Sequence, residues 1–176
     1  FKNKVKSVFG WDDKTEKFET EEEHLQRRMA EVSKAIVEAN IDHNGLPIRG
    51  KEQLDAENRH LLDPNFDASN LPKTTAESIA RKLLTYSLSE TQEKGKHKAR
   101  VIQSVMGITK ANAEELAKRI VFDINIATKK ENTKYGQKYE QTISLINNND
   151  EEIAFLTGWI YHKDGVLRLT TAYIKK

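Results

Sequence analysis

The spacing of hydrophobic residues changes along this chain and divides it into a helical part and a strand part. Apolar residues three and four positions apart predict four helices and one weaker helical stretch. The helices are expected at 20–40, 74–88, 96–106 and 109–124, and the weaker stretch at 51–62. Alternating apolar and polar residues predict strands at 137–146, 151–162 and 166–174. Helices followed by strands indicate an α+β fold.

Capping and turn residues mark the boundaries of these elements. Thr20, followed by three glutamates, predicts the start of the first helix, and Asn44-Gly45 predicts its end. The segment 63–72 is rich in Pro, Asn and Asp and is expected to be a loop. We therefore expect two regions, a helical N-terminal region at 1–72 and a C-terminal domain at 73–176.

Short polar segments at 147–150 and 163–165 predict hairpin turns, so the strands should form an antiparallel meander. Alternate residues of a strand share a face of the sheet, and two assignments of the faces are open. In the first, the residues that point away from the helices are Thr157, Trp159, Thr171 and Tyr173. In the second, they are His162, Arg168 and Thr170.

The composition of the chain leads to the hypothesis that it binds a polyanion. With 176 residues, of which 37% are hydrophobic, the chain is long enough to bury a core. The absence of cysteine excludes disulfides, thiolate metal sites and thiol nucleophiles. No apolar run approaches the roughly 20 residues that span a bilayer. The formal charge is −4 over residues 1–93 and +6 over 94–176. The positive charge of residues 94–176, which include the predicted strands, favours a polyanionic partner. A basic surface that contacts only solvent would have the same composition.

Several classes of enzyme have no support in the sequence. The chain has no Walker loop, no glycine-rich dinucleotide loop, no Gly-x-Ser-x-Gly elbow and no His-Glu-x-x-His pair. Its five histidines are scattered without ligand spacing, and no compact Asp/Glu cluster accompanies them. A metal-dependent nuclease is therefore disfavoured, and the sequence indicates neither a metal site nor another cofactor.

A cationic helix start carries the first candidate chemistry. His97, Lys98 and Arg100 follow Gly95 at the predicted start of the helix 96–106. RNA cleavage without a metal ion needs a base for the 2′-hydroxyl, an acid for the leaving oxygen and groups that stabilise the charged phosphorane. Side chains of this kind can supply all three, and a helix N-terminus also favours an anion. The alternative is a helix start that is merely solvated.

The strands carry a second set of candidates. Thr157, Thr171 and Tyr173 bear hydroxyls that can orient a phosphate, although Thr and Tyr are also ordinary strand residues. Trp159 can stack on a base if it is exposed, and otherwise belongs to the core or to an interface. The stretch 134–139 interleaves basic and aromatic side chains, as in sites for single-stranded RNA, but an edge strand protected by lysines would have the same pattern.

Five motifs in order carry a family resemblance. They are KLLTYSL at 82–88, GKHKARV at 95–101, KYGQKY at 134–139, TGW at 157–159 and LTTAY at 169–173. Together, over about residues 75–176, they resemble the C-terminal toxin domains of bacterial polymorphic toxin and contact-dependent growth inhibition systems. The family-type positions are Lys98, Arg100, Tyr135, Gln137, Thr157, Trp159, Thr171 and Tyr173. This set selects the first assignment of the faces.

The resemblance implies both a fold and an activity. The fold would be helices followed by a four-stranded antiparallel sheet, as in ribonucleases of the barnase, EndoU, colicin and RelE type. The activity would be metal-independent endoribonuclease cleavage of tRNA. The catalytic residues would be His97, Lys98, Thr157, Thr171 and Tyr173. The RNA-binding residues would be Arg100, Lys134, Tyr135, Gln137 and Trp159. Because His97 is less regular in the family pattern, it shares the predicted role of base with Lys98.

The resemblance also implies a biological setting. The chain would be exported on the surface of a producer cell as part of a larger protein, and would act in the cytoplasm of a target cell. A cognate immunity protein would neutralise it, and elongation factor Tu is an expected partner because some relatives dock on it. Residues 1–72 would serve entry into the cytoplasm. Two alternatives stay open, a non-catalytic module that binds RNA or a translation factor, and a structural or secretion-associated fragment.

Overall fold

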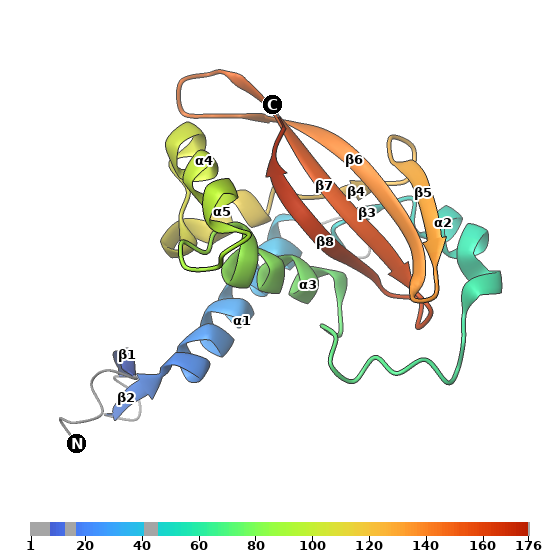
Figure 1. The fold of residues 1–176 in the computed structure, drawn as a ribbon, viewed down its shortest axis with the longest axis horizontal. Helices are drawn as coiled ribbons and strands as arrows, with labels where there is room; N and C mark the ends of the chain where they lie inside the picture. Colours follow the sequence, from blue (N-terminus) through green and yellow to red (C-terminus); the bar gives the residue numbers. More distant parts are fainter. Residues whose placement is uncertain (1–7, 13–16, 41–45, 176) are drawn as a thin grey trace.

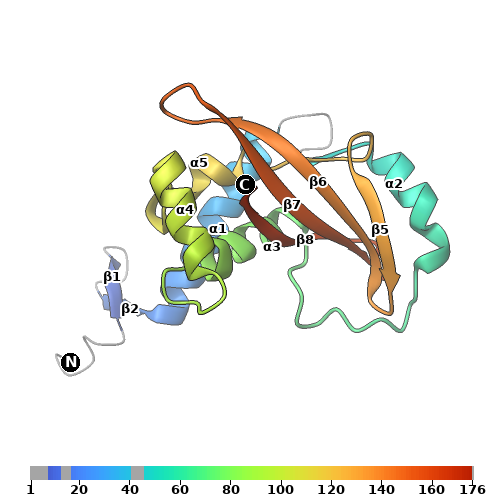
Figure 2. The ribbon, with the colours of Figure 1, turned by 45° about the horizontal axis from the view of Figure 1, so that its top comes forward.

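The computed structural model describes residues 8–12, 17–40 and 46–175. Most of the helices gather on one side of the molecule, and a four-stranded sheet occupies the other side (Figures 1 and 2). A hairpin of β1 (Val8–Asp12) and β2 (Lys17–Thr20) lies at the end of the first helix that is remote from the sheet. The rest of the first segment, at 1–7 and 13–16, lies outside the described residues.

The first long helix begins as its sequence predicts. Helix α1 spans Glu21–Ala39 and starts at a capping box. Thr20 Oγ1 accepts a hydrogen bond from the Glu23 N–H (3.1 Å), and the Glu23 carboxylate accepts one from the Thr20 N–H (3.2 Å). Its buried stripe includes Val32 and Ile36. The predicted stop at Asn44-Gly45 lies outside the described residues.

Short elements connect α1 to the sheet. They are β3 (Ile48–Arg49), α2 (Lys51–Asn58), the 3-10 turn η2 (Arg59–Leu61), α3 (Thr75–Lys82), the π-helical turn η3 (Leu83–Ser87), α4 (Lys96–Met106), the 3-10 turn η4 (Lys110–Asn112), α5 (Ala113–Ala117) and β4 (Phe122–Asp123). The predicted fourth helix is shorter than its apolar stripe, because the chain leaves the helix after Ala117 and enters β4. Ile120 and Ile124 of that stripe are buried all the same.

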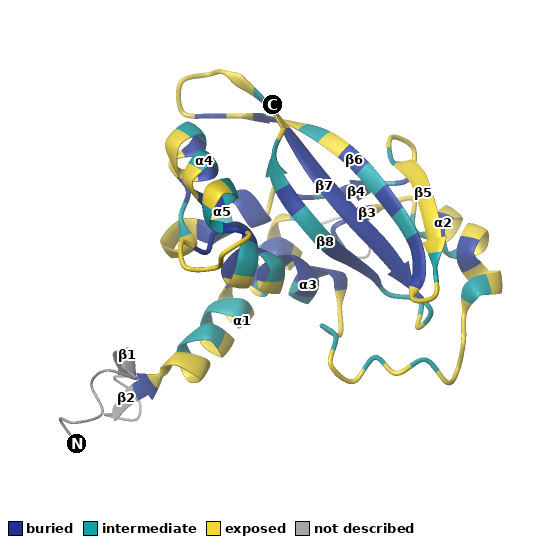
Figure 3. Cartoon of the chain, in the orientation of Figure 1, coloured by how far each residue is buried: buried dark blue, intermediate teal, exposed yellow. Residues whose placement is uncertain are grey.

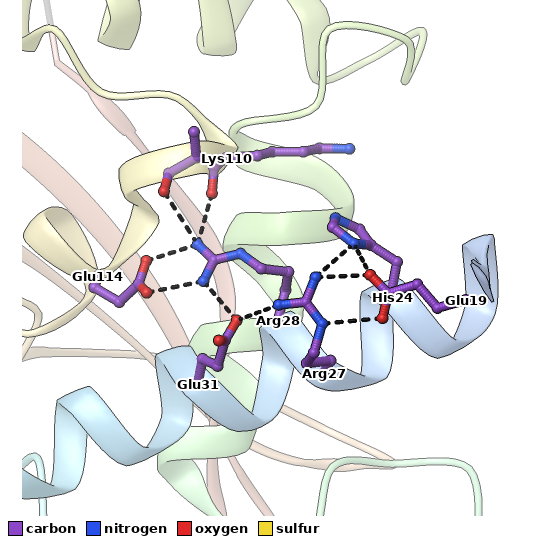
Figure 4. A network of polar contacts seen from close by, with 8 residues as sticks. Glu19, His24, Arg27, Arg28, Glu31, Lys110 and Glu114 are labelled. Carbon is purple, nitrogen blue, oxygen red and sulfur yellow. Dashed lines mark hydrogen bonds and ion pairs between the residues drawn. The ribbon is translucent and has the colours of Figure 1, made fainter. Parts of the chain in front are cut away.

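An arginine ties α1 to α5. The Arg28 side chain is only 14% exposed and donates to both carboxylate oxygens of Glu114, at 2.8 and 2.7 Å. It also donates to the Lys110 carbonyl (2.9 Å) and to Glu31 (3.0 Å), and Figure 4 shows its guanidinium among these groups. A two-point pair between a guanidinium and a carboxylate is strong and directional. Arg28 therefore holds the N-terminal helix against the C-terminal half of the chain.

The hydrophobic core is continuous across the boundary that was expected at residue 72. Strand β3 pairs in parallel with β4, and hydrogen bonds join α2 to the sheet. Asn58 of α2 donates to the Tyr139 hydroxyl (2.8 Å), and the Tyr161 hydroxyl donates to Asp55 (3.0 Å). Buried residues of α1, β3, α2 and the sheet belong to one cluster. The helical region described here thus shares its core with the C-terminal region.

The sheet is antiparallel throughout, in the order β5-β6-β7-β8. Its strands are β5 (Thr128–Thr133), β6 (Gly136–Ile146), β7 (Glu152–His162) and β8 (Leu167–Ile174). The α+β fold with a four-stranded antiparallel sheet is confirmed, as are the hairpin turns at 147–150 and 163–165. Strand β5 has no alternating apolar residues and was not located by the spacing.

Helix α3 covers the free edge of β8. The Thr75 hydroxyl donates to the Leu167 carbonyl (2.7 Å), and the Leu169 N–H donates to the Ser78 hydroxyl (3.0 Å). An uncovered edge strand would expose unpaired backbone groups, so these side chains replace a fifth strand. The same contacts fix the distance between α3 and the sheet.

The strand register corrects the predicted faces of the sheet. Cross-strand partners share a face, and Thr157 pairs with Ala172, whereas Leu156 pairs with Tyr173. Thr157 therefore lies on the core face, opposite to Tyr173. The register shifts by one residue at Gly158/Trp159, so an extra residue in β8 changes the alternation there. The face away from the core, here called the outer face, carries Ile160, His162, Arg168, Thr170, Thr171 and Tyr173.

The prediction that Thr157 and Trp159 face outward is wrong. Both are fully buried, and Trp159 packs edge to face on Phe122, with ring centroids 5.5 Å apart. The indole N–H donates to Thr157 Oγ1 (2.8 Å), whose hydroxyl donates to the Gln141 carbonyl (3.2 Å). Their hydrogen bonds are thus satisfied inside the core. Figure 3 shows that β7 is buried along most of its length.

Gln137 is also enclosed, contrary to its predicted contact with RNA. It is 4% exposed, and its amide donates to the Lys130 carbonyl (2.6 Å) and to the Lys138 carbonyl (3.1 Å). These contacts span the irregular pairing between β5 and β6. Strand β5 itself is exposed almost throughout and lies at the edge of the sheet (Figure 3). Lys129 and Lys130 of β5 suit an exposed edge strand. The stretch 134–139, for which an edge strand was the alternative, lies in the turn and in the inner strand β6.

Candidate anion-binding cleft

A cavity of about 500 Å³ lies between the outer face of the sheet, the end of α3 with η3, and the loop 62–74. Its lining includes Ile160 and Thr170 from the sheet, Lys82 and Tyr86 from the helical side, and Tyr135 from the β5–β6 turn. Pockets of roughly 300–1,000 Å³ hold small ligands in proteins. This space, here called the sheet cavity, is therefore large enough for one.

The loop 62–74 closes one end of the sheet cavity. The Asp63 N–H donates to the Lys163 carbonyl (2.9 Å), and the Phe66 ring lies 5.7 Å from the ring of His162, centroid to centroid. Arg168, which is 3% exposed, donates to the Pro72 carbonyl (2.6 Å). The loop is therefore tied to both strands that flank the 163–165 turn.

The charge of Arg168 is matched within the fold. Its guanidinium donates to both carboxylate oxygens of Asp164, at 2.7 and 3.0 Å. Burial alone would raise the pKa of Asp164, but the hydrogen bond and charge of Arg168 leave this pKa below its ordinary value. Arg168 therefore contributes to the structure of the cavity more than to unpaired positive charge.

His162 lines the sheet cavity as a neutral ring. Burial, and then the charge of Arg168, lower the pKa of His162 to about 4, while Asp164 acts in the opposite direction. Among the described residues, its Nδ1 has no hydrogen-bond partner. Leaving a neutral ring nitrogen unpaired costs less than burying an unpaired charge, which agrees with the direction of the pKa shift.

Two lysines and two tyrosines form a cluster at the helical side of the cavity, which Lys82 and Tyr86 line. Lys98 Nζ lies 4.6 Å from the ring centroid of Tyr173 and 5.5 Å from that of Tyr86. Lys82 Nζ lies 5.3 Å from the same Tyr86 ring. We call these four residues the lysine–tyrosine cluster. The rings stabilise the ammonium groups through cation–π contact.

The lysines of this cluster have no carboxylate partner among the residues that the structure describes, in contrast to Lys51, Lys96 and Lys118. Burial, and then repulsion from Arg81 and Lys98, lower the pKa of Lys82. A lowered lysine pKa means that the charged form is destabilised, and a nearby anion would stabilise it. The cluster is thus suited electrostatically to a phosphate group.

A glycine allows the cluster to form. A Cβ atom at position 95 would lie 2.3 Å from the Tyr86 carbonyl oxygen, so no other residue permits this close approach of α4 to η3. Lys98 follows one turn later and reaches the Tyr86 ring. The turn that carries Tyr86 is π-helical, a geometry often found at functional sites.

The structure brings together several of the residues predicted from sequence. Lys98 and Tyr173 are in contact, and Thr171 is half-buried on the same outer face. Tyr135 is 53% exposed and lines the sheet cavity. Lys134 is exposed beside it, with Nζ 5.0 Å from the Tyr135 ring centroid.

The structure does not bring the other predicted residues to this site. His97 and Arg100 are exposed on α4, and neither lines the sheet cavity. Gln137, Thr157 and Trp159 belong to the core face or to the β5–β6 pairing, as described above. The predicted helix start therefore contributes through Lys98 alone.

Sequence reasoning gave no role to Lys82, Tyr86, His162 or Thr170. Lys82 and Tyr86 are four residues apart, the spacing at which a cation and an aromatic ring meet on a helix, and this signal was available. His162 and Thr170 belonged to the second assignment of the faces. Their placement needed the tertiary structure, because alternation alone does not say which face is covered.

The fold and the cleft define an α+β protein with a cationic site on the outer face of an antiparallel sheet. Residues 70–176 match the family described as "Domain of unknown function (DUF6883)", and the chain belongs to this family. No curated protein and no solved structure matches the chain. The match contains every strand of the sheet and the whole lysine–tyrosine cluster, while α1 and α2 precede it.

Within residues 8–12, 17–40 and 46–175, no helix has the length and apolarity needed to cross a bilayer. Within the same ranges, no three His, Asp or Glu side chains gather in a way that could hold a metal ion.

Proposed function

We propose that this protein is an endoribonuclease that cleaves RNA without a metal ion, with the phosphodiester bound at the lysine–tyrosine cluster. The observation that carries the proposal is the pair of Lys82 and Lys98, two cations on one Tyr86 ring that lack a carboxylate partner in the described part of the chain. Two like charges at short range repel each other, and a phosphate between them would replace repulsion with charge-assisted hydrogen bonds.

The chemistry is an internal transesterification. The 2′-oxygen attacks the adjacent phosphorus, the bond to the 5′-oxygen breaks, and the products are a 2′,3′-cyclic phosphate and a 5′-hydroxyl. The 2′-hydroxyl proton passes to a water molecule, because a phosphate bound beside Lys82 stabilises the charged form of this lysine. Lys98 would stabilise the charge of the phosphorane, and the hydroxyl of Tyr173, whose ring contacts Lys98, would supply the proton of the leaving oxygen.

The choice of substrate and setting comes from the sequence. Residues 75–176 resemble toxin domains of contact-dependent growth inhibition systems, which favours tRNA as the RNA. It also favours a target cell cytoplasm as the place of action, a cognate immunity protein as inhibitor and elongation factor Tu as a partner. The charge of +6 over residues 94–176 supports a polyanionic substrate.

The test is cleavage of total tRNA by the purified protein, with and without bacterial extract and with and without EDTA. The extract supplies any partner that cleavage requires. Lys98→Ala should lower the rate by about 100-fold or more, as for removal of a group that stabilises transition-state charge. His97→Ala is the matched control, because His97 is the neighbouring residue of α4 and is exposed outside the lysine–tyrosine cluster.

Each outcome distinguishes the hypotheses. Discrete shortened products that persist in EDTA and disappear with Lys98→Ala support the proposal. A folded Lys98→Ala protein that cleaves at the wild-type rate contradicts the assigned site, and loss of cleavage in EDTA contradicts the metal-free mechanism. Retention of intact tRNA with no new ends favours the non-catalytic binding module.

A further inference from the structure

We infer that the sheet cavity binds one unpaired nucleotide, with its base over Ile160 beside Tyr135 and its phosphate at the lysine–tyrosine cluster. The inference rests on the proposed function and specifies its substrate as RNA that is single-stranded at the point of binding.

The sheet cavity has two chemically different ends. One end carries the ammonium group of Lys82 and the ring of Tyr86. The other carries Tyr135, the apolar side chain of Ile160 and the neutral ring of His162, together with Arg168, whose charge is paired with Asp164. A nucleotide has the same division, with an anionic phosphate and an uncharged aromatic base. One molecule of this class can therefore satisfy both ends.

Tyr135 is held in place by the backbone of its turn. The Tyr135 N–H donates to Thr133 Oγ1 (3.2 Å), and the Thr133 hydroxyl donates to the Gly136 carbonyl (3.1 Å). A Cβ atom at Gly136 would lie 2.0 Å from the Tyr161 carbonyl oxygen, so the turn lies directly against β7. An exposed aromatic ring on such a fixed turn is a preorganised surface for stacking.

The size of the cavity requires that the bound nucleotide be unpaired and unstacked. Tyr86 and Tyr135 both line a space of about 500 Å³. Bases in a duplex are stacked and paired, and their faces become available only in loops, bulges or ends. A base can therefore enter between these side chains only after it has left its stack. Duplex RNA could offer its phosphates to Lys82 and Lys98 but not a base to Tyr135.

The experiment measures binding by fluorescence anisotropy with probes that cannot be cleaved. The probes are a 2′-O-methyl oligonucleotide of mixed sequence, an abasic 2′-O-methyl strand of the same length, and a long blunt-ended duplex of the same 2′-O-methyl chemistry. Because none has a free 2′-hydroxyl next to a phosphate, binding is read separately from cleavage. The intact single strand should bind about tenfold more tightly than the abasic strand, as expected for one stacked base.

The variants separate the two ends of the cavity. Tyr135→Ala should weaken binding of the intact strand about tenfold and leave the abasic strand unchanged, whereas Tyr135→Phe should bind both as wild type does. Lys98→Ala should weaken both strands. Lys134→Ala is the matched control for Tyr135, since it removes a neighbouring charge and should change both strands by the same factor.

Two results would overturn the inference. One is equal affinity for the intact and abasic strands, and the other is a blunt-ended duplex that binds as tightly as the single strand. Cleavage of tRNA together with either result would leave the proposed function standing and remove the nucleotide subsite. Base-dependent binding without cleavage would keep the subsite and reject the nuclease.

Discussion

Acidification from pH 7 to pH 5 should destabilise this protein through His162. The ring is buried under the loop 62–74, beside Phe66, and burial is the main cause of its lowered pKa. The charge of Arg168 lowers this pKa further, and Asp164 partly opposes the shift. The pKa is about 4 in the folded protein and 6.5 in an unperturbed histidine. Between these values the unfolded chain binds a proton that the folded protein does not.

The difference between these two pKa values gives the direction and the size of the change in the free energy of unfolding. The contribution of His162 to the free energy of unfolding is fully present above the ordinary pKa and is lost as the pH falls toward the folded pKa. One pKa unit corresponds to about 1.4 kcal/mol, so the shift accounts for a loss of about 2 kcal/mol between pH 7 and pH 5. The loss reaches about 3 kcal/mol below pH 4, where both states are protonated.

The assay is urea unfolding at pH 7 and pH 5 for the wild type and for His162→Gln, whose side chain is polar and does not titrate. Apart from Asp164, whose pKa is lowered in part by His162, the carboxylates of the two proteins have the same surroundings, so the difference between their pH dependences reports chiefly on His162. The wild type should lose about 2 kcal/mol more than the variant between the two pH values. Equal losses in the two proteins, or a larger loss in the variant, would refute the reasoning.

Two other substitutions test the packing of the chain by the same urea measurement at pH 7. Arg28→Ala should lower the free energy of unfolding by about 2 kcal/mol, because Glu114 loses its two-point partner, while Lys34→Ala, from an exposed pair, should change it by less than about 0.5 kcal/mol. Similar effects of the two would argue against the Arg28 tie between α1 and α5. Gly136→Ala should cost about 3 kcal/mol or more, since φ is 154° and the new Cβ would lie 2.0 Å from the Tyr161 carbonyl oxygen. A Gly136→Ala protein as stable as wild type would contradict the close approach of this turn to β7.

Elements that depend on near neighbours could be predicted from the sequence. The capping box of Thr20 and Glu23 involves residues three apart, and the 163–165 turn joins two alternating strands. Strand β5 could not be predicted in this way, because its residues are polar and show no alternation. It forms a strand through its pairing with β6. The fourth helix is shorter than predicted. Its apolar stripe continues into Ile120 and Ile124, which are buried outside the helix.

The candidate site was predicted only in part. Lys98 and Tyr173 were singled out from the sequence, and they meet at 4.6 Å between the ammonium nitrogen and the ring centroid. Thr157 and Trp159 were placed on the wrong face. Alternation shows which residues of one strand share a face, but the covered face depends on what packs against it, here α2 and β4. The extra residue in β8 changed the alternation as well.

Local patterns of residues were sufficient to predict the order of helices and strands, the basic strand half and the cationic start of α4, because each follows from composition or from contacts within a few residues. The tertiary structure alone decided that Lys82 and Lys98 share the ring of Tyr86, that His162 is buried as a neutral ring and that Tyr135 lines the same cavity. These properties depend on distances between segments that are far apart in the chain. Such distances are set by how the helices and the sheet pack, and no local pattern of residues specifies them.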